Sequence, residues 1–235
     1  MILFTGGSGL LGSEFKLLFP KSLFPIKHEF NVTNPSQMRY FMMKQLDRID
    51  TVVHCAAQKD QRKINLDPLI ANTHNIIGTA NLVDVCARWG IRLVYISTDY
   101  VFDGHSGPYN EESATNPVNK YGLSKLGGEC AVRLYDRSLV IRTSFGPKEF
   151  AFPHAFEDQV SCREVVDVIA RKIKPLITSS VTGIVNVGGE PRTVLEYARS
   201  INPLVQPIKL LSVDIKIPRD TTLITRKYEQ IIGGL

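Results

Sequence analysis

The sequence predicts an α/β fold, a Rossmann-type doubly wound parallel sheet with a small C-terminal substrate lobe. Short apolar runs alternate with amphipathic stretches up to about residue 142, a pattern typical of βαβ units with helices on both faces of a parallel sheet. A glycine-rich segment, residues 5–12, directly follows the first apolar run, where a dinucleotide-binding turn would stand.

The elements of the first part of the chain follow in order. Pro25 weakens the second strand because it removes a ladder donor. Asn34 caps the second helix, Pro35 takes its first position, and Gly90 ends the third. We expect strands at 2–5, 22–26, 51–54, 91–97 and 138–142, and helices at 10–19, 35–46, 66–89 and 120–134.

The pattern loosens after residue 142. The stretch 146–154 is a loop rich in aromatic residues and proline, and the C-terminal tail has several prolines and little periodicity. An apolar stripe predicts a helix over 161–174, and we expect a strand at 183–187 and a helix at 193–201. We therefore expect an NAD(P)-binding core over 1–142 and a small substrate-binding lobe over 143–235, partly interleaved with the core.

Composition narrows the classes of function. The net charge of +5 is spread along the 235 residues without a Lys/Arg block, which argues against nucleic acid as a partner and suits phosphate-bearing small ligands. Four cysteines lie far apart with no CxxC pair, so we expect neither a metal site nor a disulfide framework. No run reaches about 18 apolar residues, so we expect no membrane span and a cytoplasmic protein.

The glycine turn carries the first functional motif. Gly6, Gly9 and Gly12 have the spacing of a dinucleotide-binding turn. Glycines let the chain turn sharply and let the backbone approach pyrophosphate, while the helix that begins at Leu10 and Leu11 offers free N–H groups. This turn predicts NADP(H) or NAD(H) as cofactor.

The choice between the two cofactors depends on a charged segment about twenty residues further on. Lys27 and His28 suit the 2′-phosphate of NADP(H), whereas Glu29 suits the ribose hydroxyls of NAD(H). A solvated charged loop explains the segment about as well. The segment favours NADP(H) slightly.

A tyrosine and a lysine form the candidate catalytic centre. Tyr121 and Lys125 stand at i and i+4, on one face of a helix. We expect the ammonium to lower the pKa of the phenol, so that Tyr121 can exchange a proton with a carbonyl or alcohol oxygen. Thr98 follows a strand at its carboxyl end, where open α/β sheets bind ligands, and could hydrogen-bond the same oxygen.

The chain resembles the extended short-chain dehydrogenase/reductases and, within them, the dTDP-4-dehydrorhamnose reductase family. The matching segments are TGGSGLLG, HCAA, Asn72 with Gly78-Thr79, STDYVFDG, YGLSKLGGE after Pro117, IRTS, Asp158-Gln159 and PRDTTL. They extend over nearly the whole chain, and STDYVFDG is the most diagnostic.

The resemblance implies a reductase that transfers hydride from NAD(P)H to C4 of a 4-keto-6-deoxy nucleotide sugar. Thr98, Tyr121 and Lys125 would be catalytic, and Asp99, Tyr100 and Phe145 would contact the sugar. The cofactor would contact Gly6, Gly9, Leu10, Leu11, Gly12, Lys27, His28, Asn31, Val32, Cys55, Ala56, Ala57, Asn72, Ser97, Tyr121 and Lys125. A homodimer is left open.

Three other functions are weighed. Sugar-nucleotide 4,6-dehydratases carry Asp-Glu after the catalytic threonine, whereas Tyr100 follows Asp99 here, so reduction is favoured over elimination. An NAD-dependent nucleotide-sugar epimerase and a non-catalytic dinucleotide-binding regulatory subunit stay open, because the chain departs from the family pattern. Only thirteen residues separate Ser144 from Asp158, where a helical segment is usual, and Asn31, Phe145 and residues 58–61 also differ.

Overall fold

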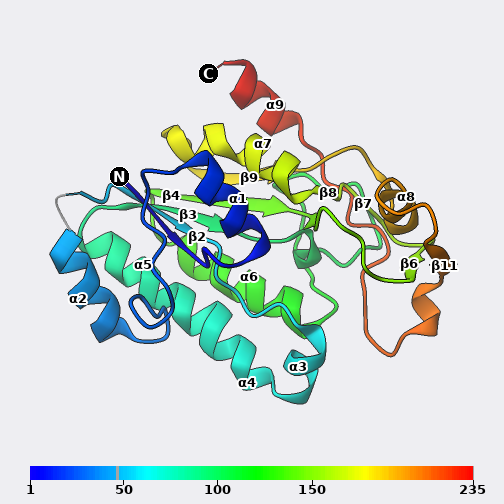
Figure 1. Cartoon of the computed structure of the whole chain (residues 1–235), viewed down its shortest axis with the longest axis horizontal. Coiled ribbons are helices and arrows are strands. Elements are labelled where there is room, and N and C mark those ends of the chain that lie inside the picture. Colours follow the sequence, from blue (N-terminus) through cyan, green and yellow to red (C-terminus); the bar gives the residue numbers. More distant parts are fainter. Residues whose placement is uncertain (46–47, 235) are drawn as a thin grey trace.

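A parallel five-stranded sheet forms the centre of the computed structural model, which describes residues 1–45 and 48–234 (Figure 1). The order of the strands is β1-β2-β3-β4-β9, and every neighbouring pair is parallel. Their bounds are β1 Ile2–Thr5, β2 Thr51–His54, β3 Arg92–Ile96, β4 Ser138–Thr143 and β9 Gly183–Val187. The predicted Rossmann-type fold class is confirmed.

Helices cover both faces of this sheet, which explains why its strands are buried almost throughout. Figure 1 shows α1 and α7 on one face and α2, α5 and α6 on the other. One apolar core joins Phe4 and Phe15 to Ile169, and the second joins Leu3 to Met38 and Leu82. The bounds are α1 Leu10–Leu18, α2 Pro35–Gln45, α5 Gly78–Arg88, α6 Lys120–Val132 and α7 Val166–Thr178.

The predicted strand over 22–26 is reduced to a single bridge, in which Leu23 pairs with Leu3 at the outer edge of β1. Pro25 cannot donate to a ladder, which limits the pairing. The chain then crosses to the other edge of β1, where β2 pairs. The direction of winding therefore reverses at β1, which makes the carboxyl ends of β1 and β2 a topological switch point.

Two predicted helices differ from the structure. The helix expected over 66–89 is divided into α4 (Pro68–Ala71), a π-helical stretch η1 (Asn72–Ile77) and α5, after a separate short helix α3 (Gln61–Leu66). Asp67 ends α3 and caps α4, with Pro68 at its first position. The helix expected over 161–174 begins at Val166, because Val160–Ser161 and Glu164–Val165 form the short strands β7 and β8. The predicted end of α2 at Leu46 lies outside the described residues.

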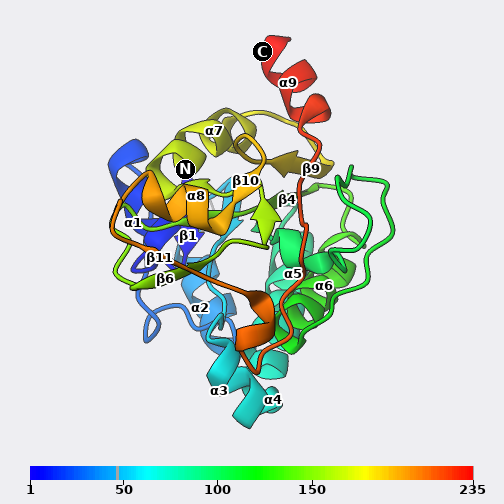
Figure 2. The ribbon, with the colours of Figure 1, turned by 90° about the vertical axis from the view of Figure 1, so that its right-hand side faces the viewer.

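Short elements gather at the carboxyl end of the sheet (Figure 2). They are β5 Phe145–Gly146, β6 His154–Phe156, β10 Arg192–Thr193, α8 Val194–Arg199, β11 Gln206–Ile208 and the 3-10 turns η2 Asp99–Val101 and η3 Leu210–Ser212. The pairs are β5 with β8, β7 with β10 and β6 with β11. The C-terminal helix α9 (Arg226–Gly233), which the sequence did not indicate, projects beyond the sheet. The two-lobe division at residue 142 stays a prediction, since α7 and β9 belong to the main sheet layer.

Within the described residues, no helix is both long and apolar enough to cross a membrane.

Candidate active site

The glycine turn lies between β1 and α1 and closes tightly on β2. Gly6 has a φ of +71°, and a Cβ there would stand 2.7 Å from the Ala56 nitrogen. A Cβ on Gly12 would lie 2.2 Å from the Gly6 carbonyl oxygen. Gly9 caps α1 without a side chain, so the N–H groups of the first turn stay available for an anion.

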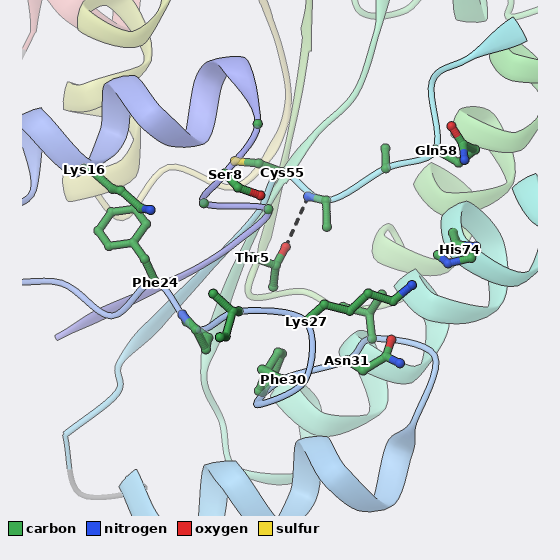
Figure 3. A pocket seen from close by; sticks show the side chains of 18 residues that line it. Thr5, Ser8, Lys16, Phe24, Lys27, Phe30, Asn31, Cys55, Gln58 and His74 are labelled. Atoms are coloured by element: carbon green, nitrogen blue, oxygen red, sulfur yellow. Dashed lines mark hydrogen bonds between the residues drawn. The ribbon is translucent and has the colours of Figure 1, made fainter.

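A cavity of about 420 Å³ lies beside this turn, at the switch point (Figure 3). Its walls come from the glycine turn, the segment after Leu23 and the loop that follows β2. The lining residues are Thr5, Gly6, Gly7, Ser8, Gly9, Lys16, Phe24, Pro25, Ile26, Lys27, Phe30, Asn31, Val32, Cys55, Ala56, Ala57, Gln58 and His74. The position matches the place where open α/β sheets bind dinucleotides.

The structure brings eight of the predicted cofactor residues to this cavity: Gly6, Gly9, Lys27, Asn31, Val32, Cys55, Ala56 and Ala57. Others fall outside its lining. Leu11 is buried in the apolar core, Leu10 is exposed at the surface, and Gly12 serves the close packing of the turn. His28 is exposed, and its backbone carbonyl accepts a hydrogen bond from the Gln37 side chain.

The charge of the lining is positive. Lys27 and Lys16 both line the cavity, and none of the described residues that line it is acidic. Glu29, the acid considered for a ribose, instead accepts a hydrogen bond from the Ile26 N–H at 3.0 Å and so closes its own loop. This wall of the cavity is therefore suited to a phosphate group.

A buried histidine holds the two strand ends together. His54 Nδ1 lies 2.7 Å from Thr5 Oγ1, and His54 Nε2 lies 3.1 Å from Thr79 Oγ1. Thr5 Oγ1 accepts from Ala56 N, and the Thr79 hydroxyl donates to the Asn75 carbonyl. All these bonds are satisfied when His54 is neutral with its proton on Nε2. Burial, aided by the charge of Lys125, lowers the pKa of His54 to about 3.

Thr98 and Tyr121 meet at the carboxyl end of β3. Thr98 is buried and caps η2, accepting from the Tyr100 N–H at 3.2 Å, while its hydroxyl donates to Asp99 at 3.1 Å. Tyr121 stands in the first turn of α6, half-buried, and the Thr98 side chain is close enough to its phenol to counter part of the rise in its pKa. The predicted threonine and tyrosine are thus neighbours in space.

Lys125 lies one turn further along α6 and is buried. Its ammonium donates to the Ile96 carbonyl at 2.8 Å and lies 4.0 Å from the centre of the Tyr95 ring. Burial lowers the pKa of Lys125 to about 7, against the opposing charges of Glu129 and Cys55.

The expectation that Lys125 lowers the pKa of Tyr121 is wrong for this structure. Burial raises the pKa of Tyr121, and the negative charge of Asp99 raises it further. The Lys125 ammonium is directed to Ile96 and Tyr95 rather than to the phenol. Tyr121 is therefore protonated at neutral pH, the state that a proton donor needs.

The three residues predicted to contact the sugar differ in their burial and in their neighbours. Asp99 is buried and accepts from Thr221 at 2.6 Å; burial raises the pKa of its carboxyl group. The Tyr100 ring lies edge-on to that of Tyr121, 6.3 Å away, and its hydroxyl accepts from Gln159 at 2.9 Å. Phe145 is partly buried against the apolar core. Tyr100 is therefore the one in direct ring contact with Tyr121.

A buried ion pair lies one turn beyond Lys125 in α6. Arg142 donates to Glu129 at 2.9 Å, and both side chains are almost fully buried. Ser97, predicted to contact the cofactor, donates to Glu129 at 2.5 Å instead, so its hydroxyl faces this pair. Because Glu129 follows Lys125 by four residues in α6, its carboxylate supports the charged form of the lysine.

Asn75 is a residue that sequence reasoning missed. It is buried in η1, donates to the Gln58 carbonyl and to Ser124 Oγ at 2.8 Å each, and accepts from the Gln58 N–H at 2.7 Å. Asn72, which we predicted, is exposed and does not line the cavity. The usable signal was spacing, since Asn75 precedes Gly78 by three residues and so shares its helix face.

Comparisons with known proteins agree with this geometry. The family model described as the RmlD substrate binding domain matches residues 1–184. A solved structure of dTDP-4-dehydrorhamnose reductase from Bacillus anthracis, in complex with NADP, superposes with a TM-score of 0.89 at 24% identity, covering 98% of this chain and 92% of that one. That likeness shows the fold.

Two curated relatives have different functions: one is a subunit of another enzyme and the other is a reductase. Methionine adenosyltransferase 2 subunit beta from Xenopus laevis is 44% identical over 81 residues, covering 34% of this chain and 24% of the relative. The dTDP-4-keto-6-deoxy-D-glucose reductase from Streptomyces niveus is 34% identical over 176 residues, covering 71% and 60%. Both matches span less than two thirds of the relative's length. The model match over most of the chain shows that this protein belongs to the RmlD substrate binding domain family.

Proposed function

We propose that the chain is an NADP(H)-dependent reductase of a 4-keto-6-deoxy nucleotide sugar. The observation that carries the proposal is that Thr98 and Tyr121 are neighbours in space and that a buried lysine, Lys125, follows one turn later in the same helix. The cavity beside the glycine turn provides the place for the cofactor. Membership of the RmlD family supports it, as does the similarity to the reductase from Streptomyces niveus.

The cavity fits a phosphorylated dinucleotide. Its glycines leave no room for a Cβ at Gly6, and the uncapped start of α1 is free to hold the pyrophosphate. Ala56 and Ala57 present small side chains where β2 ends. Lys27 would contact the 2′-phosphate, because a cation rather than an acid lines this end, and NADP(H) is therefore the proposed cofactor.

When bound, NADP(H) would supply the hydride that reduces C4. Tyr121 donates its phenolic proton to the C4 oxygen, so that the ketone becomes an alcohol and a phenolate is left on Tyr121. The raised pKa of Tyr121 keeps that proton available. The Thr98 hydroxyl, which donates to Asp99 in this structure, would turn its proton to the same oxygen when the sugar binds, and Lys125 would bind the nicotinamide ribose. Tyr100 and Phe145 border the sugar, and Asp99 holds Thr98 in place before the sugar binds.

The proposal is tested by following the oxidation of NADPH and of NADH with a dTDP-4-keto-6-deoxy sugar generated in situ. We expect one NADPH to be consumed for each sugar reduced, with NADH used less efficiently. An epimerase would recycle its cofactor and show no net oxidation. Tight NADPH binding without any consumption of the sugar would overturn the reductase assignment.

A second candidate function is a regulatory subunit without catalysis, favoured by the 44% identity to methionine adenosyltransferase 2 subunit beta over 81 residues. The presence of Thr98, Tyr121 and Lys125 together favours the enzyme. The two are separated by adding the chain to a methionine adenosyltransferase catalytic subunit. Co-elution and a changed rate of that enzyme would support regulation, while separate elution would exclude it for the subunit tested.

A further inference from the structure

A segment close to the C-terminus, residues 219–223, lies beside the catalytic centre before the chain enters α9 (Figure 2). Backbone hydrogen bonds hold it on two sides. The Thr221 N–H donates to the Val160 carbonyl at 3.0 Å, and the Tyr109 N–H donates to the Thr222 carbonyl at 2.7 Å. The position of this segment is therefore fixed by two parts of the chain that are distant in sequence.

Gly104 makes room for the 219–223 segment. Its φ is +79°, and a Cβ there would stand 2.5 Å from the Arg219 nitrogen. The Asp220 N–H also donates to the Gly104 carbonyl at 3.1 Å. Glycine meets both demands because it has no Cβ. The motif STDYVFDG, which carries Thr98 and ends at Gly104, thus also receives the C-terminal segment.

Thr221 brings a hydroxyl from this segment to the residue that follows Thr98. Its Oγ1 donates to Asp99 Oδ2 at 2.6 Å, across 122 residues of sequence, and both side chains are buried. The other carboxylate oxygen of Asp99 accepts from the Thr98 hydroxyl at 3.1 Å. Each oxygen of the carboxylate thus has a hydroxyl donor, and Thr221 fixes the orientation in which Asp99 receives Thr98.

The charge of the Asp99 carboxyl group depends on this hydrogen bond. Burial raises the pKa of the group, and the hydrogen bond from Thr221 is the largest effect that opposes the rise, followed by the positive charge of Arg163. Burial also raises the pKa of three titratable neighbours, and the negative charge of Asp99 adds to the rise in each: Tyr100, Tyr121 and Cys162. Thr221 therefore acts on a charge that the catalytic phenol feels.

We propose that Thr221 is a positioning residue of the catalytic centre, which holds Asp99 so that Thr98 stands ready for the carbonyl oxygen of the sugar. The inference rests on the proposed function, and it concerns a residue outside 1–184, the part of the chain that the family model matches. With both oxygens bonded, the Asp99 carboxylate is kept from turning, and the Thr98 hydroxyl keeps its place near Tyr121. Without the Thr221 hydroxyl, one buried oxygen loses its donor and the carboxylate can turn away from Thr98. A small displacement of a group that fixes the reacting oxygen lowers the rate.

The test compares the wild type with Thr221→Val, Thr221→Ser and Thr222→Val. Thr221→Val removes the hydroxyl and nearly keeps the shape of the side chain, whereas Thr221→Ser keeps the hydroxyl. Thr222 is the matched control, because it is buried in the same segment, while the hydroxyl donors to Asp99 are Thr221 and Thr98. Thermal unfolding shows which variants are folded, and Thr221→Ala takes the place of Thr221→Val if the latter is not.

Steady-state rates with NADPH and the keto sugar give the first readout. Thr221→Val should lower kcat about tenfold or more. The KM for NADPH should stay within about twofold, because Thr221 does not line the glycine-turn cavity. Thr221→Ser should recover most of the lost rate, and Thr222→Val should stay within about twofold of the wild type. An unchanged kcat in Thr221→Val, or an equal loss in Thr222→Val, would overturn the proposal.

A ¹³C NMR titration of the Asp99 carboxyl group gives the second readout, which requires no turnover. Asp99→Asn identifies the signal. Thr221→Val should raise the pKa of Asp99, because a donor that stabilises the charged form is lost, and Thr222→Val should not. The acidic limb of the rate profile should move to higher pH in Thr221→Val for the same reason.

The two readouts separate this inference from the proposed function. The same Asp99 pKa in the wild type and in Thr221→Val would overturn the positioning role. If the pKa responds to Thr221 but no protein consumes NADPH with the keto sugar, the control of Asp99 by Thr221 stands and the proposed reduction fails.

Discussion

The Lys125 ammonium donates a hydrogen bond to the Ile96 carbonyl, 2.8 Å away, at the end of a buried strand. The ammonium group is thus held by a backbone carbonyl, directly before the Ser97-Thr98 segment that carries the proposed catalytic hydroxyl. Its burial lowers its pKa to about 7, so that charge on this lysine depends on the pH near neutrality.

This pKa predicts a pH-dependent stability. Between about pH 7 and the ordinary lysine pKa of about 10.4, the unfolded chain binds a proton that the folded chain does not. Folding should therefore become more stable as the pH rises through this window, by no more than about 1.4 kcal/mol per unit. Urea unfolding at pH 7, 8 and 9 measures the slope. Lys125→Met should flatten it, and equal slopes in the two proteins would contradict the account.

Asn75 should act as a positioning residue for α6. Asn75→Ala removes its bonds to Gln58 and Ser124 and leaves partners unsatisfied, at a cost of about 1–3 kcal/mol in stability. We expect kcat to fall at least about tenfold with little change in the KM for NADPH. Asn75→Asp keeps the bond from the Gln58 N–H but turns a carboxylate oxygen toward the Gln58 carbonyl, and should be impaired at least as strongly.

Asn72→Ala is the matched control, because Asn72 is exposed on the same helical stretch. It should leave both the rate and the unfolding midpoint near the wild-type values. A loss of activity in Asn72→Ala equal to that in Asn75→Ala would restore Asn72 as a site residue and contradict the assignment made from the structure.

The pair of Arg142 and Glu129 should show strong coupling. Arg142→Met leaves the Glu129 carboxylate buried without its cation, which costs about 3–5 kcal/mol when such a pair is broken. The double variant Arg142→Met/Glu129→Gln removes the charge as well and should recover part of the loss. Chemical unfolding of the two single variants and the double variant gives the coupling energy, and simple additivity would count against a buried ion pair.

Cofactor choice should depend on Lys27. Lys27→Met is expected to weaken NADPH binding about tenfold or more through loss of a charge-assisted phosphate contact, with NADH binding nearly unchanged. His28→Ala is the comparison, since His28 does not line the cavity. Fluorescence titration with both dinucleotides separates these outcomes. A variant that loses NADH and NADPH equally would place Lys27 away from the 2′-phosphate.

The sequence predicted the elements that depend on residues close together in the chain. Glycine is required at position 6 because the backbone there lies against Ala56, and α6 begins directly after its cap, Asn119. The strand predicted over 22–26 is only a single bridge at Leu23, because Pro25 limits its pairing. The start of α7 was missed because Glu164 bonds to Ser144, a contact distant in sequence.

In the candidate site too, features set by neighbouring residues were predicted and those set by contacts distant in sequence were not. Tyr121 and Lys125 follow from spacing along one helix, whereas the direction of the Lys125 ammonium depends on a strand 29 residues earlier in the chain. Lys16 and His74 reach the cofactor cavity from two separate helices, and no local motif marks them. Asn72 and Asn75 both lie in η1, and the structure shows that Asn75 is buried and bonded to Gln58 whereas Asn72 is exposed.

In the proposed reduction by NADP(H), Tyr121 delivers the proton to the sugar. The most direct measurement is single-turnover oxidation of NADPH with a dTDP-4-keto-6-deoxy sugar by the wild type and Tyr121→Phe, with NADPH affinity determined in parallel. We predict a loss of rate of at least about a hundredfold and an NADPH dissociation constant within about twofold. A Tyr121→Phe protein that reduces the sugar at the wild-type rate would contradict the claim.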